Sequence, residues 1–274
     1  MKNKICFIVN VEYVVNHFLI NHLAALSKIY EVTLVGNFNR LPKLEEKGID
    51  VNIHRIPFRR GMNLLCDIFA FGMLFIFLIN NKFDVIHSIT PKMGFFTSII
   101  GFILGFKKRI HTFTGQVWAF KKGIRAFFFK YADKVTGALT THCLVDSLSQ
   151  LEFLRANGIL HKEKGIVLGA GSISGVDTKK FKFNQAKRES IRRHLAIPID
   201  AFCLVFIARL SEAKGIFDLI EALEKVANSS IYLSGLSIIK CTSKIKSVLS
   251  LIDFIIGTPN EIFGTKFPSI TSMW

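Results

Sequence analysis

No CxxC pair occurs in this 274-residue sequence, and its cysteines outline neither a zinc site nor a disulfide framework. The five cysteines are odd in number, scattered along the chain and mostly placed in apolar runs. Unpaired thiols of this kind are typical of proteins kept in a reducing cytoplasm. We therefore expect them to be buried free thiols.

Motifs of several enzyme classes are missing as well. The sequence has no P-loop, no HExxH and no GxSxG, and no pair of carboxylates stands out as an acid–base couple. The stretch GAGSIS starts like a dinucleotide fingerprint, but Ser174 takes the place of its last glycine and no helix clearly follows. We expect neither a bound metal nor a cofactor.

Acidic residues are few beside basic ones: 20 Asp and Glu stand against 36 Lys and Arg, a formal net charge of +16. This excess favours an anionic partner, either nucleic acid, nucleotide phosphates or an acidic lipid surface. Half of the chain is hydrophobic and 27 residues are Phe, so the chain can build a sizeable core. Its length suits one large or two ordinary domains.

Long hydrophobic runs are also scarce. The apolar stretch Ile5–Asn10 is too short for a signal peptide and fits a first β-strand. Leu64–Ile79 is the one candidate for a membrane span, but it contains Asp67 and is shorter than the roughly 20 apolar residues that a spanning helix needs. We favour a buried or interfacial helix there and keep a membrane anchor as an alternative.

Strand and helix patterns alternate over residues 1–168, which predicts a parallel sheet with helices on both faces. Strands are expected at Lys4–Asn10, Glu31–Val35, Asp50–Arg55, Phe83–His87, Arg109–Thr112, Cys143–Val145 and Lys164–Leu168. Helices are expected at His17–Leu26, Leu64–Ile79, Gly94–Leu104, Gly123–Thr136 and Leu148–Asn157. The first domain is therefore expected to be an α/β domain of the Rossmann type.

Residues 169–185 begin with the glycine- and serine-rich sequence GAGSISGVD and are expected to form a hinge. Residues 186–274 start a second strand–helix series, with a strand at Ala201–Ile207, a helix at Gly215–Val226 and a strand near Ile231–Leu233. The pattern fades after that. This part has fewer than about 100 residues, too few to complete a second sheet of the same kind.

The first candidate site follows the strand at Ala201–Ile207. Arg209 stands just past its carboxyl end, and Lys214 precedes Gly215 at the start of the next helix. Ligands of open α/β sheets bind outside the carboxyl ends of the strands, and a helix N-terminus attracts phosphate. Arg209, Lys214 and Gly215 could therefore clamp a diphosphate, or the two cations could simply be solvated near a turn.

The second candidate site is the segment IHTFTGQVWAFKK, where polar side chains gather around a glycine after a strand. It contributes His111, Thr114, Gly115 and Gln116, with Trp118 close by. Hydroxyls, amides and a flat aromatic ring suit a sugar. His111 by itself could also be a hydrogen-bonded histidine of the core.

The third candidate site is the segment DVIHSITPKMG, which places His87 and Ser88 at another strand end. His87 could line the same cleft or merely cap its strand. Asp146 and Ser147 follow a further strand, where the simpler interpretation is an N-cap for the next helix.

Basic and aromatic residues are mixed in the first domain. The cations are Arg55, Arg59, Arg60, Lys107, Lys108, Arg109, Lys121, Lys122, Arg125, Lys130 and Lys134. Any one cluster could be solvated charge, and the mixture suits either nucleic acid or an anionic bilayer. We favour an anionic membrane surface over nucleic acid because the neighbouring helices are so apolar.

Several of these segments together resemble bacterial family 4 glycosyltransferases of capsule and O-antigen synthesis. The resemblance rests on HTFTGQVWA, VDSLSQLEFL, GSISGVD with Phe181, ARLSEAKGIFDLIEAL, DVIHSITPKMG and the start NHFLINHLAALSKIYEVTLV. It runs from about Lys4 to Tyr232, with the motifs in the family's order and spacing.

The resemblance implies a GT-B fold, with two Rossmann-like domains around an active cleft. Arg209 and Lys214 match the family's contacts to the donor diphosphate, where they would stabilise the departing nucleotide. His111 matches a histidine at the cleft, assigned as catalytic, and Thr114 and Gly115 match its loop. The family implies transfer with retention, usually without metal, from a nucleotide-sugar to an acceptor that is often a lipid-linked saccharide. Such an enzyme would be cytoplasmic and peripheral to the inner face of the cell membrane.

Two positions depart from the family. Ala208 replaces a usual glycine, and a later Glu-rich segment with carboxylates seven residues apart is not found, since Glu261 has no partner at that spacing. We therefore expect a truncated second domain and impaired transfer. The alternative is a non-catalytic remnant or binding module that keeps only the acceptor domain. A nucleotide-sugar epimerase would share the architecture, but the HTFTGQ loop argues against it.

Overall fold

The computed structural model describes residues 2–39, 41–59, 61–195, 197–200, 203–208 and 212–227. By its internal contacts the chain divides into two units, Met1–Lys182 and Phe183–Trp274. The division falls within the expected hinge 169–185. Each unit is described by itself below.

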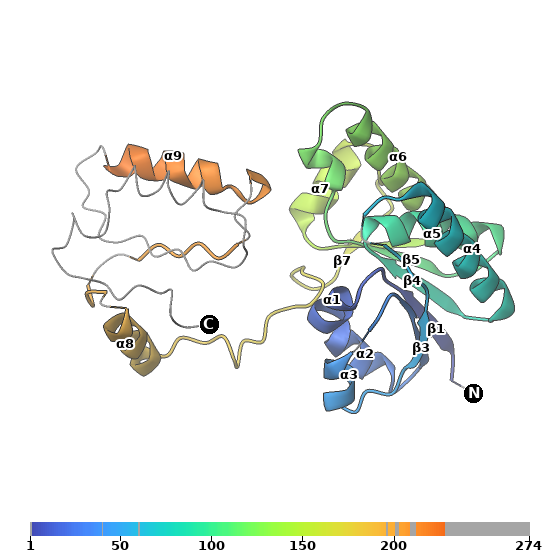
Figure 1. Cartoon of the computed structure of the whole chain (residues 1–274), viewed down its shortest axis with the longest axis horizontal. Helices are drawn as coiled ribbons and strands as arrows, with labels where there is room; N and C mark the ends of the chain where they lie inside the picture. Colours follow the sequence, from blue (N-terminus) through green and yellow to red (C-terminus); the bar gives the residue numbers. More distant parts are fainter. Residues whose placement is uncertain are drawn as a thin grey trace. The chain divides into compact units, whose positions relative to one another are not determined.

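The first unit is built on a sheet of seven parallel strands (Figure 1). They are β1 Lys4–Ile8, β2 Glu31–Gly36, β3 Asn52–Arg55, β4 Val85–Ile89, β5 Arg109–Phe113, β6 His142–Val145 and β7 Ile166–Val167. Their order across the sheet is β3-β2-β1-β4-β5-β6-β7, so the chain runs outward from β1 in one direction and then from β4 in the other. This is the doubly wound arrangement that the alternating pattern predicts.

Helices cover both faces of the sheet. One face carries α1 Glu12–Val14, the π-helix η1 Val15–Leu19, α2 Ile20–Leu26 and α3 Pro42–Glu46. The other face carries α4 Leu64–Asn80, α5 Pro91–Ile103, the 3-10 helix η2 Val117–Phe120, α6 Gly123–Leu139 and α7 Leu148–Ala156. Figure 1 shows the labelled helices in these two layers.

The core lies on both sides of the sheet because side chains of a strand alternate between its faces. In β1, Phe7 packs with Leu19 and Leu23, while Ile8 packs with Leu74 on the opposite side. All five side chains are fully buried or nearly so. A strand that is apolar on both faces is typical of a parallel sheet between helices.

The expected strands and helices of residues 1–168 are all present, with ends shifted by a few residues. Three short elements were not expected: α3, the π-helix η1 inside the first helix, and η2 inside the loop after β5. Ser147 caps α7 by accepting a hydrogen bond from the amide of Gln150 at 3.1 Å, which confirms the simpler interpretation of that residue.

In the second unit the structure describes α8 Gln185–His194, the 3-10 turn η3 Glu212–Lys214 and α9 Ile216–Ala227. Helix α9 confirms the expected helix, and α8 was not expected. The strand expected at Ala201–Ile207 is wrong for the described part, because residues 203–207 form no strand. A strand needs a hydrogen-bonded neighbour, and this stretch has none among the described residues, so Val205 and Ile207 are exposed. The strand expected near Ile231–Leu233 lies outside the described residues.

Candidate functional site

The strand order reverses between β1 and β4, and this is the point where open α/β sheets bind their ligands. Ile8 pairs with Ser88 in the register of these two strands, so Asn10 and Thr90 follow at matching positions beyond the ladder. The next strand, β5, ends at Phe113 and leads into the loop of Gln116. We call the residues that follow these three strand ends the carboxyl edge.

Three buried polar atoms at the carboxyl edge have no hydrogen-bond partner among the described residues. They are Asn10 Oδ1, Thr90 Oγ1 and Gln116 Nε2. Asn10 and Gln116 are 8% and 9% exposed. A buried polar atom without a partner costs roughly 1–3 kcal/mol, so such groups are retained where a ligand or water satisfies them. An acceptor, a hydroxyl and a donor that follow three neighbouring strands are complementary to the hydroxyl groups of a sugar.

Three further side-chain atoms without a described partner, Asn16 Oδ1, Thr97 Oγ1 and Arg155 Nε, lie within helices rather than in these loops. Asn16 belongs to the π-helix η1 that follows β1, and π-turns are frequent at functional sites. The carboxyl edge therefore holds three of the six unsatisfied buried side-chain atoms among the described residues, all of them in segments that follow neighbouring strands.

Hydrogen bonds from α7 fix the orientation of the Gln116 side chain. The amide of Asp146 donates to Gln150 Oε1 at 2.9 Å, and Gln150 Nε2 in turn donates to Gln116 Oε1 at 3.3 Å. The oxygen of Gln116 is thus occupied, and its Nε2 is left as a free donor. This chain of amides runs from α7 to Gln116 at the carboxyl edge, and the role of Gln116 in a sugar site stays a prediction.

Thr90 has a backbone conformation that is rare for its side chain. Its φ is 79°, in the left-handed region, where a β-branched residue is strained. It is the N-cap of α5, yet its hydroxyl makes no capping hydrogen bond. Strain of this kind persists mainly where function selects it.

Replacing Thr90 with Gly is expected to raise the free energy of unfolding by about 1 kcal/mol. Glycine relieves a strain of about 1–3 kcal/mol, and its greater freedom in the unfolded chain offsets part of that gain. The measurement is urea unfolding of both proteins. Thr90→Ala is the matched control, since it removes the hydroxyl but keeps the Cβ and hence the strain. A Thr90→Gly protein no more stable than Thr90→Ala would show that Thr90 is unstrained.

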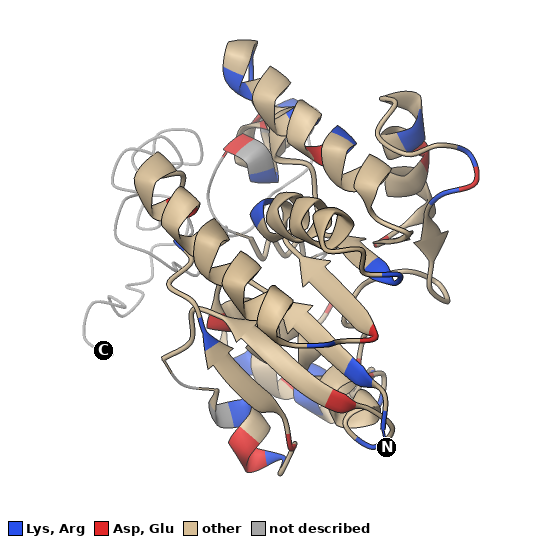
Figure 2. Ribbon diagram, turned by 90° about the vertical axis from the view of Figure 1, so that its right-hand side faces the viewer, with Lys and Arg blue, Asp and Glu red and all other residues tan. Residues whose placement is uncertain are grey.

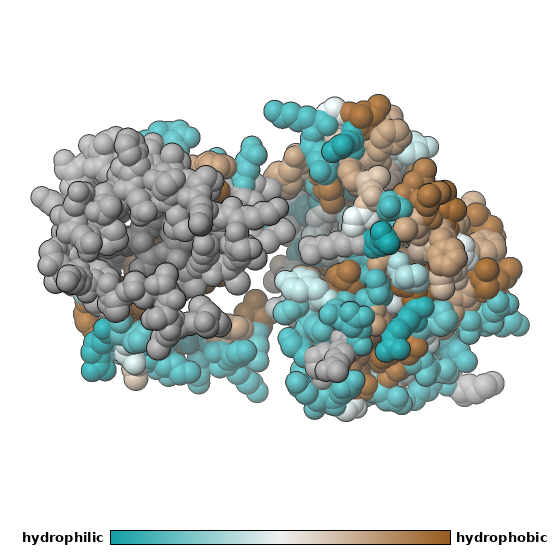
Figure 3. Space-filling model, in the orientation of Figure 1, coloured by the Kyte–Doolittle hydropathy of each residue, from teal (hydrophilic) through white to brown (hydrophobic). Residues whose placement is uncertain are grey.

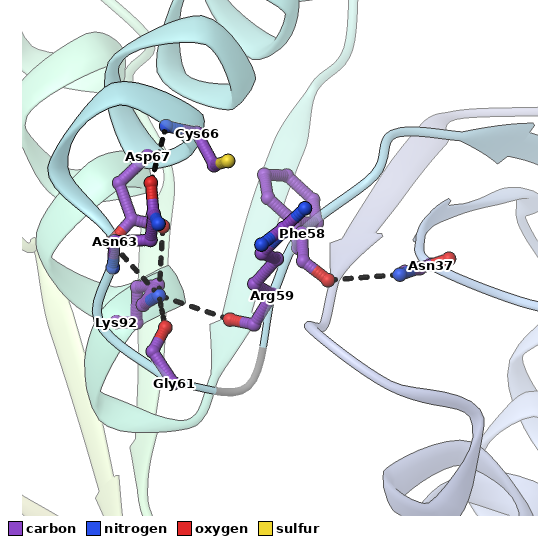
Figure 4. Close-up of polar contacts among 8 residues, drawn as sticks. All are labelled: Asn37, Phe58, Arg59, Gly61, Asn63, Cys66, Asp67 and Lys92. Atoms are coloured by element: carbon purple, nitrogen blue, oxygen red, sulfur yellow. Dashed lines mark hydrogen bonds and ion pairs between the residues drawn. The ribbon is translucent and has the colours of Figure 1, made fainter.

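Lys92, in the first turn of α5, is not available to a ligand. Its Nζ donates to Asp67 Oδ1 at 2.8 Å and also bonds to the carbonyl oxygens of Arg59 and Gly61 (Figure 4). Both charged side chains are largely buried, at 14% and 16% exposed. Asn63 caps α4 beside them. Lys92 therefore fixes the connection between β3 and α4 against α5.

The sequence candidates His87, Ser88 and His111 lie beneath the carboxyl edge, inside the sheet. Ser88 Oγ is 2.9 Å from His111 Nδ1 on the face covered by α5, and His87 Nε2 is 2.8 Å from Thr112 Oγ1 on the opposite face. These are two separate pairs rather than one cluster. His111 is 1% exposed and His87 9%.

Burial lowers the pKa of both imidazoles to about 3, so both are neutral near pH 7. A smaller electrostatic effect of His22 on His87, and of His87 on His111, acts in the same direction. His111 thus has the geometry of the hydrogen-bonded core histidine that was left open above. Its assignment as a catalytic residue stays a prediction.

Thr114 and Gly115 are partly exposed at the carboxyl edge, beside Gln116. Trp118, by contrast, offers no open aromatic face. It is buried, stacks on Phe153 with ring centroids 5.2 Å apart, and donates its indole N–H to Asp133 at 2.7 Å. Burial raises the pKa of Asp133 to about 6, and the hydrogen bond from Trp118 lowers it in part.

Asn10, Tyr13 and Thr90 were missed by the sequence interpretation. Tyr13 follows β1, is 57% exposed, and lies 4.2 Å from the ring of His17. It is the exposed aromatic side chain nearest in sequence to Asn10. None of these residues belongs to a recognisable motif. Their position just after an apolar strand was the one feature that could have indicated them, and many other loop residues share that position.

In the second unit, Lys214 is exposed in η3 and Gly215 precedes α9. Gly215 has a φ of 73°, which favours glycine, and its amide bonds to the carbonyl of Glu212 at 2.8 Å. Arg209, the other half of the expected diphosphate clamp, lies outside the described residues, so the clamp stays a prediction. Among described residues, no group of three or more His, Cys, Asp or Glu could hold a metal ion.

Comparison with known proteins gives relatives in sequence and in fold. No protein-family model matches the chain. The chain is 26% identical over 223 residues to the capsular polysaccharide biosynthesis glycosyltransferase CapM of Staphylococcus aureus, which covers 76% of this chain and 57% of CapM. The chain therefore spans little more than half the length of that relative.

Two solved structures share the fold. Anabaena HepE, in complex with UDP and glucose, matches with a TM-score of 0.58 and 17% identity over 81% of this chain and 58% of HepE. Sucrose-phosphate synthase of Thermosynechococcus elongatus matches with a TM-score of 0.58 and 14% identity over 82% of this chain and 60% of that enzyme. These likenesses confirm the expected α/β fold of the GT-B type.

Proposed function

We propose that the chain acts in surface polysaccharide synthesis as a glycosyltransferase, moving a sugar from a nucleotide-sugar to a saccharide acceptor. The observation that carries the proposal is the set of buried polar atoms at the carboxyl edge, on Asn10, Thr90 and Gln116, that have no hydrogen-bond partner among the described residues. The relationship to a capsular polysaccharide glycosyltransferase supports the same activity.

The first unit supplies the acceptor site. Asn10 Oδ1 accepts a hydrogen bond from an acceptor hydroxyl, Gln116 Nε2 donates one, and Thr90 Oγ1 does either. Tyr13, which is exposed and follows Asn10 by three residues, offers a ring on which a sugar can stack. The buried pairs beneath, Ser88 with His111 and His87 with Thr112, keep the strand ends in place and the floor of the site uncharged.

The donor binds to the second unit. Lys214 stands directly before Gly215, and α9 begins at the next residue, Ile216. A donor diphosphate bound there would contact the ammonium group of Lys214 and the backbone amides of the first turn of α9. Arg209 adds a second cation. A nucleoside diphosphate donor is supported by HepE, whose solved structure contains UDP. Transfer with retention of configuration and without a metal is part of the proposal, on the strength of the family resemblance.

The acceptor is proposed to be a lipid-linked saccharide, and the protein to attach peripherally to the inner, anionic face of the cell membrane. The exposed apolar helices of the first unit support this part of the proposal.

A thermal-shift screen tests the donor side. The full chain is melted with UDP-glucose, other nucleotide-sugars, UDP and glucose alone. A bound donor is expected to raise the free energy of unfolding by about 2.7 kcal/mol at 100 times its dissociation constant, and Lys214→Met is expected to shrink the shift. The matched control is Lys225→Met, at the far end of α9. No shift with any nucleotide, from a chain that melts cooperatively, would contradict the proposed function.

A further inference from the structure

Helix α4 has an apolar surface toward solvent. Its inner face packs into the core through Ala70, Leu74 and Leu78. Its outer face exposes Leu64, Leu65, Ile68, Phe69, Ile76 and Ile79, each at least 57%. Asp67 is the helix's single charged residue, and it is tied to Lys92. A helix of the outer layer normally turns charged side chains to water, so α4 indicates a non-aqueous neighbour.

A second exposed apolar group lies in the same layer, on η2 and the first half of α6. Phe120, Ile124, Phe127, Phe128 and Tyr131 are all at least 57% exposed. The ring of Phe127 meets that of Phe128 edge to face and stacks on that of Tyr131. Lys121, Lys122 and Arg125 are exposed among them. The combination of aromatic and basic side chains is typical of segments that lie in a membrane interface.

The two groups belong to one surface. Helix α5 packs against both α4 and α6, so the three helices form a continuous layer over the sheet. Figure 3 shows hydrophobic side chains gathered over the region of α4 and α5. In Figure 2, which turns that side toward the viewer, the helices of this layer carry few charged residues. We call this surface the α4–α6 face.

The α4–α6 face borders the carboxyl edge. Helices α4, α5 and α6 each follow a strand and therefore start at the edge where the strands end. Leu65 and Phe69 lie in the first two turns of α4, and Ile124 and Phe127 in the first two turns of α6. The apolar side chains thus begin next to the site of Asn10 and Thr90.

A membrane span does not account for α4. Its 17 residues give a length of about 25 Å, less than the roughly 30 Å of a hydrocarbon core. Within the described part of the chain, no helix is both long and apolar enough to cross a bilayer. Since one side of α4 is packed on the sheet, the helix can only lie along a membrane.

We propose that the α4–α6 face docks flat on an anionic lipid bilayer, with its apolar side chains among the acyl chains and its lysines and arginines at the lipid phosphates. The charge of the chain, +16, is complementary to such a surface. The inference rests on the proposed function and extends it: the carboxyl edge stands at the interface, where a lipid-linked acceptor reaches Asn10, Thr90 and Gln116 without leaving the bilayer.

Vesicle co-sedimentation of the full chain tests the proposal. The wild type is expected to bind vesicles of phosphatidylglycerol mixed with phosphatidylcholine and to bind phosphatidylcholine alone more weakly. Replacing Phe127 and Phe128 with Ser, or Leu65 and Phe69 with Ser, is expected to lower binding at least about tenfold, because each removes two large apolar groups. Ile29→Ser, an equally exposed residue on the opposite layer, is the matched control.

The dependence of vesicle binding on salt concentration separates the contribution of the basic residues from that of the inserted apolar side chains. Replacing Lys121 and Lys122 with Gln is expected to reduce binding at low salt only, whereas the loss caused by the Phe127 and Phe128 variant persists at high salt. Failure of the folded wild type to bind anionic vesicles would overturn the proposal. So would a dimer that these Phe replacements convert to a monomer, because the face would then be covered by a second copy. Vesicle binding needs no nucleotide, so its failure is distinguishable from a failure of donor binding.

Discussion

Lowering the pH from 7 to about 5 is expected to remove about 4 kcal/mol of stability through His87 and His111 together. Each has a folded pKa of about 3 and an unfolded value of 6.5. Between these values the unfolded chain binds protons that the folded protein excludes, so stability is complete above 6.5 and is lost as the pH falls. Each histidine accounts for about 2 kcal/mol at pH 5.

Asp133 opposes this loss in part. Its folded pKa, raised to about 6 by burial, lies above the ordinary value of 3.8. The folded protein therefore binds the extra proton in this range and gains roughly 1 kcal/mol on going to pH 5. The net expectation is a loss of about 3 kcal/mol, a large share of the 5–15 kcal/mol that typical domains possess.

Urea unfolding at the two pH values measures this loss. His161→Gln, at an exposed histidine, is the control and is expected to keep the wild-type dependence. His111→Gln is expected to reduce the net loss from about 3 to about 1 kcal/mol, because one histidine accounts for about 2 kcal/mol. Should that variant not fold, NMR of the wild type can follow the ring resonances of His87 and His111 as the pH is lowered and so measure the pKa of each ring. Titration of either ring near pH 6.5, or equal stability at both pH values, would contradict the buried, neutral pairs.

Gly94→Ala is expected to destabilise the first unit by about 2 kcal/mol. A Cβ at Gly94 would meet the ring of His111, 2.8 Å from its Nδ1 and 2.9 Å from its Nε2. The ring cannot easily move away, because its Nδ1 is hydrogen-bonded to Ser88 and the side chain is 1% exposed. Overpacking costs about 1–3 kcal/mol or more, and the better helix propensity of alanine offsets up to 1 kcal/mol.

Gly72→Ala is the matched control for this prediction. Gly72 also lies inside a helix, α4, but a Cβ there meets no atom within 4 Å. The change is expected to stabilise the protein by up to about 1 kcal/mol. Opposite signs for the two alanine variants in the same urea-unfolding experiment would confirm the close approach of α5 to His111. Equal effects would show that α5 does not pack against that ring.

The alternation of strands and helices was predictable because it is a local property of the sequence. Runs such as ICFIV, residues 5–9, are apolar at every position, which requires burial on both faces and therefore a parallel sheet between helices. The short helix α3 and the turn η2 could not be predicted, since each is one turn or so without a periodic pattern. The strand expected at Ala201–Ile207 was wrong for residues 203–207: an apolar run forms a strand only where it pairs with a neighbour, and this stretch has none among the described residues.

The carboxyl edge was predictable only in part. Gln116 belonged to a visible polar cluster, whereas Asn10 and Thr90 come from loops 80 residues apart that meet because β1 pairs with β4. That adjacency depends on strand order, which local patterns do not contain. The same holds for the ion pair of Lys92 with Asp67, which joins α5 to α4 and therefore depends on how these two helices pack.

Hydrogen–deuterium exchange of the full chain, with and without a polyprenyl-diphosphate-linked saccharide in detergent micelles, tests the central claim most directly. The account predicts slower exchange on binding in the loops after β1, β4 and β5, which contain Asn10, Thr90 and Gln116, and no such change with empty micelles. Protection confined to other segments, or none in these loops at saturating saccharide, would contradict an acceptor site at the carboxyl edge.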